Sequence, residues 1–194
     1  SFMSIIFNSS LSSYSLIIST ANTNKINIIY APHHSLEQDS LMFATFLDSG
    51  KYLLEFAKKH RNEINWIFKP HPRLKYSLIM NNLMTESEVN TYYSEWENLG
   101  TIHNTGNYFD IFKNSDAMIT DSISFLAEYL PTNKPIIQLT NPKHYPYNKI
   151  GNIIEKVLYK AYSQEEFKQI FDNVILSKND LLKFIITLSS SRTI

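Results

Sequence analysis

The stretch Asp116-Ala-Met-Ile-Thr-Asp-Ser-Ile-Ser-Phe-Leu-Ala-Glu-Tyr129 combines the signals of a strand, a turn and a helix in one short segment. Its apolar run, 117–119, is too short for a helix and suits a buried strand. Three residues that commonly cap helices follow, namely Thr120, Asp121 and Ser122. Apolar residues then recur at helical spacing. The stretch therefore predicts a strand, a tight polar turn and the start of a helix.

The start of this helix is a candidate anion site. Free backbone N–H groups at a helix start, with hydroxyl groups beside them, suit a phosphate group. We therefore expect Asp121, Ser122 and Ser124 to bind the phosphates of a nucleotide, although many α/β folds use such a junction only as a turn. Glu128 lies one helical turn beyond Ser124 and would reach a ribose hydroxyl pair. The alternative for Glu128 is a solvent-exposed carboxylate.

A second motif, Lys69-Pro-His-Pro72, follows a predicted strand at 65–69. A lysine at the end of a strand can pair with a phosphate, and the two prolines hold the loop extended. His71 can donate to a phosphate or act as an acid or base near neutral pH. We expect Lys69, His71 and Arg73 to bind phosphate and His71 to be catalytic. The alternative is a turn whose histidine bonds to the backbone.

Composition limits the function classes. The chain has 194 residues, of which 43% are hydrophobic, enough for the core of one domain. Its 18 basic and 18 acidic residues cancel, so no overall field favours nucleic acid. The absence of cysteine fits the cytoplasm, and no apolar run is long enough to span a membrane. Four glycines do not suffice for a glycine-rich phosphate loop.

The order of elements predicts an α/β fold. Short strands alternate with helices or long loops, which indicates a parallel sheet with helices on both faces, doubly wound as in one Rossmann-like half. We expect residues 1–26 to be an arm or linker of uncertain structure and 27–194 to form the domain. The predicted strands are 27–30, 65–69, 101–104, 117–119, 135–139 and one near 156–160.

Ligands of an open parallel sheet bind outside the carboxyl ends of its strands. His33, His34 and His103 follow predicted strands at this edge and are candidate cleft residues. The spacing does not favour a metal site, because adjacent histidines are expected to point in different directions and no His-x3-His pair is present. We therefore expect no metal.

The chain resembles a known family in several motifs. Lys69-Pro-His-Pro72, followed by 115–130 and by Lys134-Pro135, is similar to the CDP-glycerol glycerophosphotransferase family, the teichoic-acid and capsule polymerases of bacteria. The segment Tyr30-Ala-Pro32 also fits that family's pattern. The resemblance covers roughly residues 27–140.

The resemblance implies a GT-B architecture, of which this chain would be the carboxyl-terminal, donor-binding half. It implies that 69–72 and 121–124 hold the donor's pyrophosphate and that Glu128 lies near the ribose. It further implies CDP-glycerol or a similar donor as substrate, no cofactor, a polymer or lipid-linked acceptor, and an amino-terminal GT-B domain outside this chain. The full-length protein would work in the cytoplasm, peripherally at the inner membrane face.

Two departures from the family pattern leave alternatives open. The family often has Asp-Tyr-Ser-Ser where this chain has Asp121-Ser-Ile-Ser124, which weakens the expectation of CDP-glycerol itself. No His-Gly motif, proposed to supply the family's catalytic base, precedes residue 27, so we expect this chain alone to bind donor and turn over poorly. The alternatives are a nucleotide-sugar glycosyltransferase domain and a non-catalytic module that binds a nucleotide or partner protein.

Overall fold

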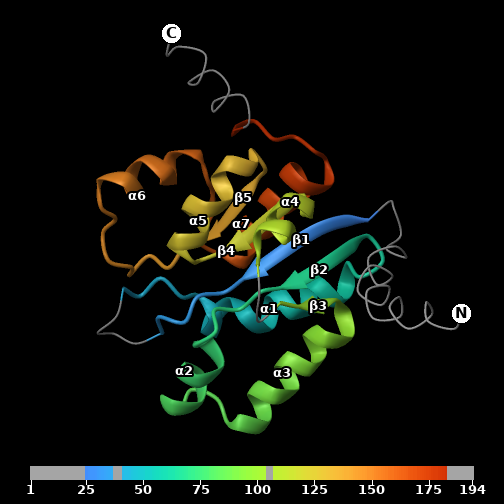
Figure 1. Cartoon of the computed structure of the whole chain (residues 1–194), viewed down its shortest axis with the longest axis vertical. Coiled ribbons are helices and arrows are strands. Elements are labelled where there is room, and N and C mark those ends of the chain that lie inside the picture. The colour runs from blue at the N-terminus through green and yellow to red at the C-terminus, as the bar shows by residue number, and fades with distance from the viewer. Residues whose placement is uncertain (1–24, 37–40, 104–106, 183–194) are drawn as a thin grey trace, which may run out of the picture.

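The structure is a computed structural model that describes residues 25–36, 41–103 and 107–182. Six parallel strands form one sheet in the order β3-β2-β1-β4-β5-β6 (Figure 1). This is the strand order of a doubly wound Rossmann-like sheet, so the predicted fold class is confirmed. The strands are β1 (Ile26–Ala31), β2 (Ile64–Phe68), β3 (Thr101–Ile102), β4 (Ala117–Thr120), β5 (Ile136–Leu139) and β6 (Tyr159–Ala161).

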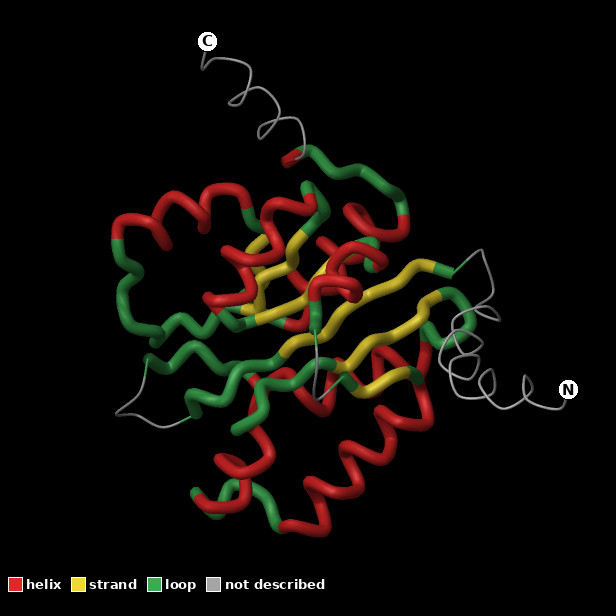
Figure 2. Tube along the Cα trace, viewed as in Figure 1, coloured by secondary structure: helices red, strands yellow, loops and turns green. Residues whose placement is uncertain are grey.

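Helices cover both faces of the sheet (Figure 2). One face packs against α1 (Phe46–Lys59), α2 (Leu74–Met80), α3 (Glu86–Leu99) and α7 (Gln164–Ile170), which continues as the π-helix η3 (Phe171–Leu176). The other face packs against α4 (Phe109–Asn114), α5 (Ile123–Tyr129) and α6 (Lys149–Ile154). Two 3₁₀ turns, η1 (Leu130–Thr132) and η2 (Glu155–Val157), follow α5 and α6.

Strand β1 shows why the sheet needs two helical layers. Its side chains alternate between the faces, so Ile28 and Tyr30 join the first core cluster while Ile29 and Ala31 join the second. All four are fully buried. A strand that is buried on both faces is encoded by a continuous run of apolar residues, and such a run predicted β1 from the sequence. Removal of either layer would expose one row of these side chains.

Most element boundaries agree with the sequence predictions, and the exceptions have local causes. The helical spacing of apolar residues predicts a helix that starts after Asp48 or Ser49, whereas α1 begins at Phe46, because the N–H of Thr45 is held by the carboxylate of Asp121. Helix α6 lies in a segment expected to be loop, and its start is capped by Asn148, whose Oδ1 accepts from the N–H of Gly151 at 2.8 Å. Ser163 caps α7 as predicted.

The structure describes only part of each end of the chain. Of the expected arm 1–26, residues 1–24 lie outside the described residues, and Ile26 already belongs to β1. The sequence also predicts a last helix from Asp180 to about Leu188, most of which lies outside the described residues.

Among the helices that the structure describes, none combines the length and the apolar character that a membrane crossing requires.

Candidate functional site

The candidate site lies at the carboxyl ends of β1, β2 and β4, where the strand order reverses and open α/β sheets bind ligands. The loop after β2 continues the hydrogen bonding of the sheet. The N–H of Lys69 donates to Tyr30 O at 2.8 Å, and the N–H of His71 donates to Pro32 O at 2.9 Å. His103 is fixed likewise, through its N–H to Phe68 O at 2.9 Å. These loops lie to the left of the sheet in Figure 1.

Asp121 joins three parts of this rim. Its Oδ1 accepts from the N–H of His33 at 2.6 Å, and its Oδ2 accepts from the N–H of Thr45 at 2.7 Å and from Thr45 Oγ1 at 3.0 Å. The residue is only 1% exposed. Burial raises the pKa of its carboxyl to about 6, although these donors oppose the rise. Asp121 thus stabilises the loops from the protein interior, and its carboxylate already accepts hydrogen bonds from donors of the protein.

The start of α5 has fewer exposed hydrogen-bond donors than the sequence suggests. Thr120 Oγ1 donates to Ala31 O at 2.7 Å and accepts from the N–H of Ser122 at 3.0 Å, which locks the ends of β1 and β4 together. Ser122 is 2% exposed, whereas Ser124 is exposed, and their hydroxyl oxygens lie 3.2 Å apart. Helix α5 has seven residues, so its dipole contributes little, and Ser124 is the hydroxyl that faces solvent.

The ammonium group of Lys69 lies near two aromatic rings. Its Nζ is 5.2 Å from the ring centroid of Tyr108 and 5.1 Å from that of Phe125, within the range of cation–π attraction. The residue is 7% exposed, and burial lowers its pKa while the nearby Glu128 opposes that shift. A hydrogen bond to the Glu128 carboxylate raises the pKa of the Tyr108 hydroxyl. The ammonium group, the carboxylate and two rings therefore form one wall of the rim.

Three histidines form a second cluster at this rim. The ring of His71 stacks on that of His34 with centroids 3.8 Å apart, and His33 lies 4.4 Å from His34. The expectation that adjacent histidines point apart is wrong here, because both rings turn toward the loop after β2. One nitrogen of each ring lies within 4.8 Å of the other two. Burial, reinforced by the neighbouring histidines, lowers the pKa of His33 and of His71 to about 4, and burial also lowers that of His34.

The remaining predicted residues lie nearby. Burial and the charge of Lys69 lower the pKa of His103. The charge of Arg73, which is exposed at the start of α2, contributes to the lowered pKa values of His34 and His71. An open groove of about 520 Å³ runs from His71 toward α3. The predicted site residues therefore lie on the loops and helix starts at this edge of the sheet, with Asp121 and Ser122 behind the surface.

Comparison with known proteins is informative at this point. The sequence profile of the family described as CDP-glycerol:poly(glycerophosphate) glycerophosphotransferase matches residues 15–187. The chain belongs to this family.

Solved structures agree in fold with this glycerophosphotransferase-family domain. The Staphylococcus aureus MnaA–UDP co-structure has a TM-score of 0.50 at 12% identity, over 83% of this chain and 39% of that one. UDP-GlcNAc 2-epimerase from Neisseria meningitidis, bound to UDP-GlcNAc, has a TM-score of 0.52 at 11% identity, over 92% of this chain and 47% of that one. The domain spans less than half the length of either, and at these identities the likeness shows the fold alone. No curated protein matches the sequence significantly.

Several residues of the glycerophosphotransferase-family motifs serve the fold. Tyr129 and Ser115 are joined by their hydroxyl groups at 2.7 Å, and Ser115 Oγ lies 3.0 Å from Phe112 O. Lys134 Nζ donates to the carbonyl groups of Phe112 and Lys113 at the end of α4, at 3.0 and 2.6 Å. Sequence reasoning missed Tyr108, Phe125 and Thr45 as parts of the site. Phe125 directly follows Ser124 in the sequence, which was the available signal for it, whereas Tyr108 and Thr45 reach the site only through the fold.

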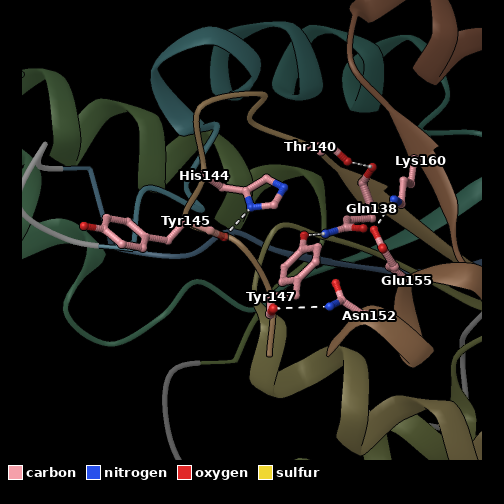
Figure 3. Close-up of polar contacts among 8 residues, drawn as sticks. All are labelled: Gln138, Thr140, His144, Tyr145, Tyr147, Asn152, Glu155 and Lys160. Atoms are coloured by element: carbon pink, nitrogen blue, oxygen red, sulfur yellow. Dashed lines mark hydrogen bonds and ion pairs between the residues drawn. The ribbon is translucent and has the colours of Figure 1, made fainter. Parts of the chain in front are cut away.

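Beyond β5, several polar and aromatic side chains contact one another (Figure 3). Gln138, which is buried at the end of β5, donates through Nε2 to the Tyr147 hydroxyl at 2.5 Å. Tyr147 stacks on His144 with ring centroids 4.5 Å apart, and Lys160 pairs with Glu155. A small pocket of about 150 Å³ also lies on this side, lined by residues that include Thr45, Thr140 and Ser163, so these contacts do not close the carboxyl edge of the sheet beyond β5.

Proposed function

We propose that this domain binds the diphosphate of a CDP-activated donor at the rim after β1, β2 and β4. In the whole protein it would be the donor-binding half of a transferase that moves glycerol phosphate, or a related polyol phosphate, to a cell-surface polymer. The observation that carries this proposal is the position of Lys69, whose Nζ lies 5.1 Å from the ring centroid of Phe125, the residue after Ser124. His71 lies two residues further along the same loop, which the hydrogen bonding of the sheet fixes.

The chemistry of these groups suits a diphosphate. A lysine ammonium and imidazole N–H groups are donors to anionic oxygens, and both are partly withdrawn from water here, which strengthens their interaction with charge. In the proposed reaction an acceptor oxygen bonds to the donor's β-phosphorus while the bond from that phosphorus to the bridging oxygen breaks, and CMP leaves. Lys69, His71 and Ser124 would stabilise the charge that builds up on the phosphates. The acceptor's proton would pass to a base on the amino-terminal half of the full-length protein.

Glu128 supports the nucleoside part of the proposal. Its carboxylate is exposed on α5 and is held in place by the Tyr108 hydroxyl. A carboxylate accepts two hydrogen bonds well, and a ribose offers two neighbouring hydroxyl donors. Glu128 would therefore orient the ribose while Lys69, beside it, holds the phosphate.

Isothermal titration calorimetry of the 194-residue chain tests the donor assignment. CDP and CMP are expected to bind more tightly than ADP and GDP, because the family's donor carries cytidine. Equal affinity for all four nucleotides, or no binding, would sink the assignment.

A nucleotide-sugar glycosyltransferase domain is the second candidate. Two solved structures of similar fold hold UDP or UDP-GlcNAc according to their descriptions, and this observation favours a uridine donor. The acceptor would then attack the sugar's anomeric carbon in place of phosphorus. Titration with UDP and UDP-GlcNAc beside CDP and CDP-glycerol separates the two candidates by the preferred base.

A further inference from the structure

Two neighbouring loops of the rim have the same local design. Ala31-Pro-His33 follows β1, and Lys69-Pro-His71 follows β2. Tyr30 and Phe68 are registered partners in the parallel ladder, so the two histidines each lie three residues beyond the same rung. Each histidine also follows a proline, which restricts the backbone on both sides of the bond. The sheet thus carries two equivalent histidines on adjacent loops.

Backbone N–H groups fix both histidines in the same tautomer. The N–H of Ser35 donates to Nδ1 of His33 at 3.2 Å, and the N–H of Arg73 donates to Nδ1 of His71 at 3.1 Å. An accepting nitrogen uses its lone pair, so the proton of each neutral ring sits on Nε2. The Ser35 hydroxyl lies 2.8 Å from the same Nδ1 and accepts from the N–H of Phe43 at 3.2 Å, which leaves its own hydrogen to point at the ring.

The two rings converge. Their centroids are 5.3 Å apart, and the ring of His34 lies against both of them. Burial is the main cause of the low pKa values of His33 and His71, both about 4, so the two rings are uncharged at neutral pH and keep their N–H groups. One nitrogen of each ring lies within 4.8 Å of a nitrogen of the other, so one small ligand group can contact both of these neutral rings.

An oxyanion suits this arrangement better than a divalent cation does. A histidine ligates a metal through a nitrogen lone pair. A metal at Nε2 of His33 or His71 would move the ring proton to Nδ1, where it would meet the N–H of Ser35 or Arg73. An anionic oxygen accepts from the two Nε2–H groups as they stand.

We propose that His33 and His71 act as paired N–H donors that hold one phosphate group of the ligand between the loops after β1 and β2. The inference rests on the proposed function of this rim and adds His33 to the residues that contact phosphate. The backbone N–H of His33 is itself held by Asp121 at 2.6 Å, which fixes its loop relative to the end of β4. The spacing between the two donors is therefore set by the fold before ligand arrives.

The first test reads the tautomers directly. Long-range ¹H–¹⁵N spectra of the ¹⁵N-histidine-labelled chain at neutral pH are expected to show Nε2–H for both His33 and His71. Inorganic pyrophosphate is then expected to shift the Nε2–H signals of both rings. An Nδ1–H form of His33, or pyrophosphate that shifts only His71, overturns the inference.

The second test uses a matched pair of variants. His33→Gln keeps an N–H donor near the Nε2 position, whereas His33→Phe keeps the ring and removes the donor. Pyrophosphate affinity is expected to fall about 10-fold or more in His33→Phe and to stay within about 3-fold of the wild type in His33→Gln. An equal loss in both variants would assign His33 a packing role and overturn the proposal.

The outcomes also separate this inference from the proposed function. A chain that binds CDP but holds pyrophosphate equally well with His33→Phe refutes the role of His33 alone. A wild-type chain that binds neither CDP nor pyrophosphate refutes the proposed function first. If zinc chloride binds at one equivalent, and this binding is lost equally in His33→Phe and His33→Gln, a metal site would replace the phosphate assignment.

Discussion

The Oδ1 atom of Asp121 accepts a hydrogen bond of 2.6 Å from the backbone N–H of His33, across 88 positions of the chain. The same carboxylate holds Thr45 through its other oxygen. One buried carboxylate therefore fixes the loop after β1 and the start of α1 against the end of β4. The rim depends on it without the carboxylate having to face a ligand.

Asp121→Ala is expected to lower the free energy of unfolding by about 2–4 kcal/mol, because three donors lose a buried partner. The pKa of this carboxyl is about 6 in the folded state and its ordinary value is 3.8, so the folded state binds the proton more tightly. The group's contribution to stability is therefore full below pH 3.8 and is lost as pH rises through about 6. Urea unfolding should show a larger effect of the variant at pH 5 than at pH 7.5.

Asp116→Ala is a matched control for that variant. Asp116 Oδ2 also accepts from a backbone N–H of β1, that of Asn27 at 2.7 Å, but the residue is exposed at the opposite end of the strands. Its loss should cost less than that of Asp121. Equal costs for the two variants would mean that burial of the Asp121 carboxylate has no energetic weight.

The histidine cluster predicts sensitivity to acid. His33 and His71 have pKa values of about 4 against an ordinary 6.5, so between these values the unfolded chain binds more protons than the folded one. Stability is therefore lost as pH falls from 6.5 toward 4, the opposite sign to Asp121. The stability lost through the two histidines exceeds the stability gained through the Asp121 carboxyl. The urea concentration at the unfolding midpoint should therefore be lower at pH 5 than at pH 7. His71→Gln should reduce that fall, and an unchanged fall would contradict the prediction.

Lys69→Met should weaken binding of CDP about 10- to 100-fold, the range expected for loss of a hydrogen bond to a charged group. Methionine keeps the apolar stem between Tyr108 and Phe125, so thermal unfolding should change little. Lys59→Met is the matched control, since Lys59 is exposed in the last turn of α1, away from the rim. Similar losses for both variants, measured by calorimetry, would argue for a general charge effect.

Glu128→Gln should weaken CMP and CDP about 10-fold and leave inorganic pyrophosphate unchanged, because only the nucleotides carry a ribose. Calorimetry with the three ligands separates the contributions. Glu63→Gln, exposed just before β2 at the opposite end of the strands, is the control for a change of net charge. A loss of pyrophosphate affinity in Glu128→Gln would place the carboxylate in the phosphate site through its effect on Lys69.

Gly100→Ala should destabilise the domain by roughly 2–4 kcal/mol. A Cβ at this position would lie 2.1 Å from the carbonyl oxygen of Trp66, so α3 or β2 would have to shift. The backbone conformation itself suits any residue, with φ of −169°. Asn98→Ala, exposed two residues earlier, should be nearly neutral in chemical denaturation. Similar stability of both variants would show that the chain relieves the clash without cost.

Local signals account for what the sequence predicted well. The buried strands, the cap at Ser163 and the turn after β4 are each encoded by neighbouring residues. The start of α1 and the histidine cluster depend on contacts between distant segments, such as Thr45 with Asp121 across 76 positions. The aromatic surroundings of Lys69 likewise depend on Tyr108, the N-cap of α4, and on Phe125 of α5. A single sequence shows which residue types reach the rim and does not show which of them meet.

The single carboxylate at the junction of β1, α1 and β4 also has a consequence for dynamics. The amide protons of His33 and Thr45 are both bound to Asp121, so each can exchange with solvent only when this junction opens. Opening of the junction as a whole would release the loop after β1 and the start of α1 together. Hydrogen exchange at these two amides should thus proceed at a common rate, and a nucleotide that binds the rim should slow both by the same factor.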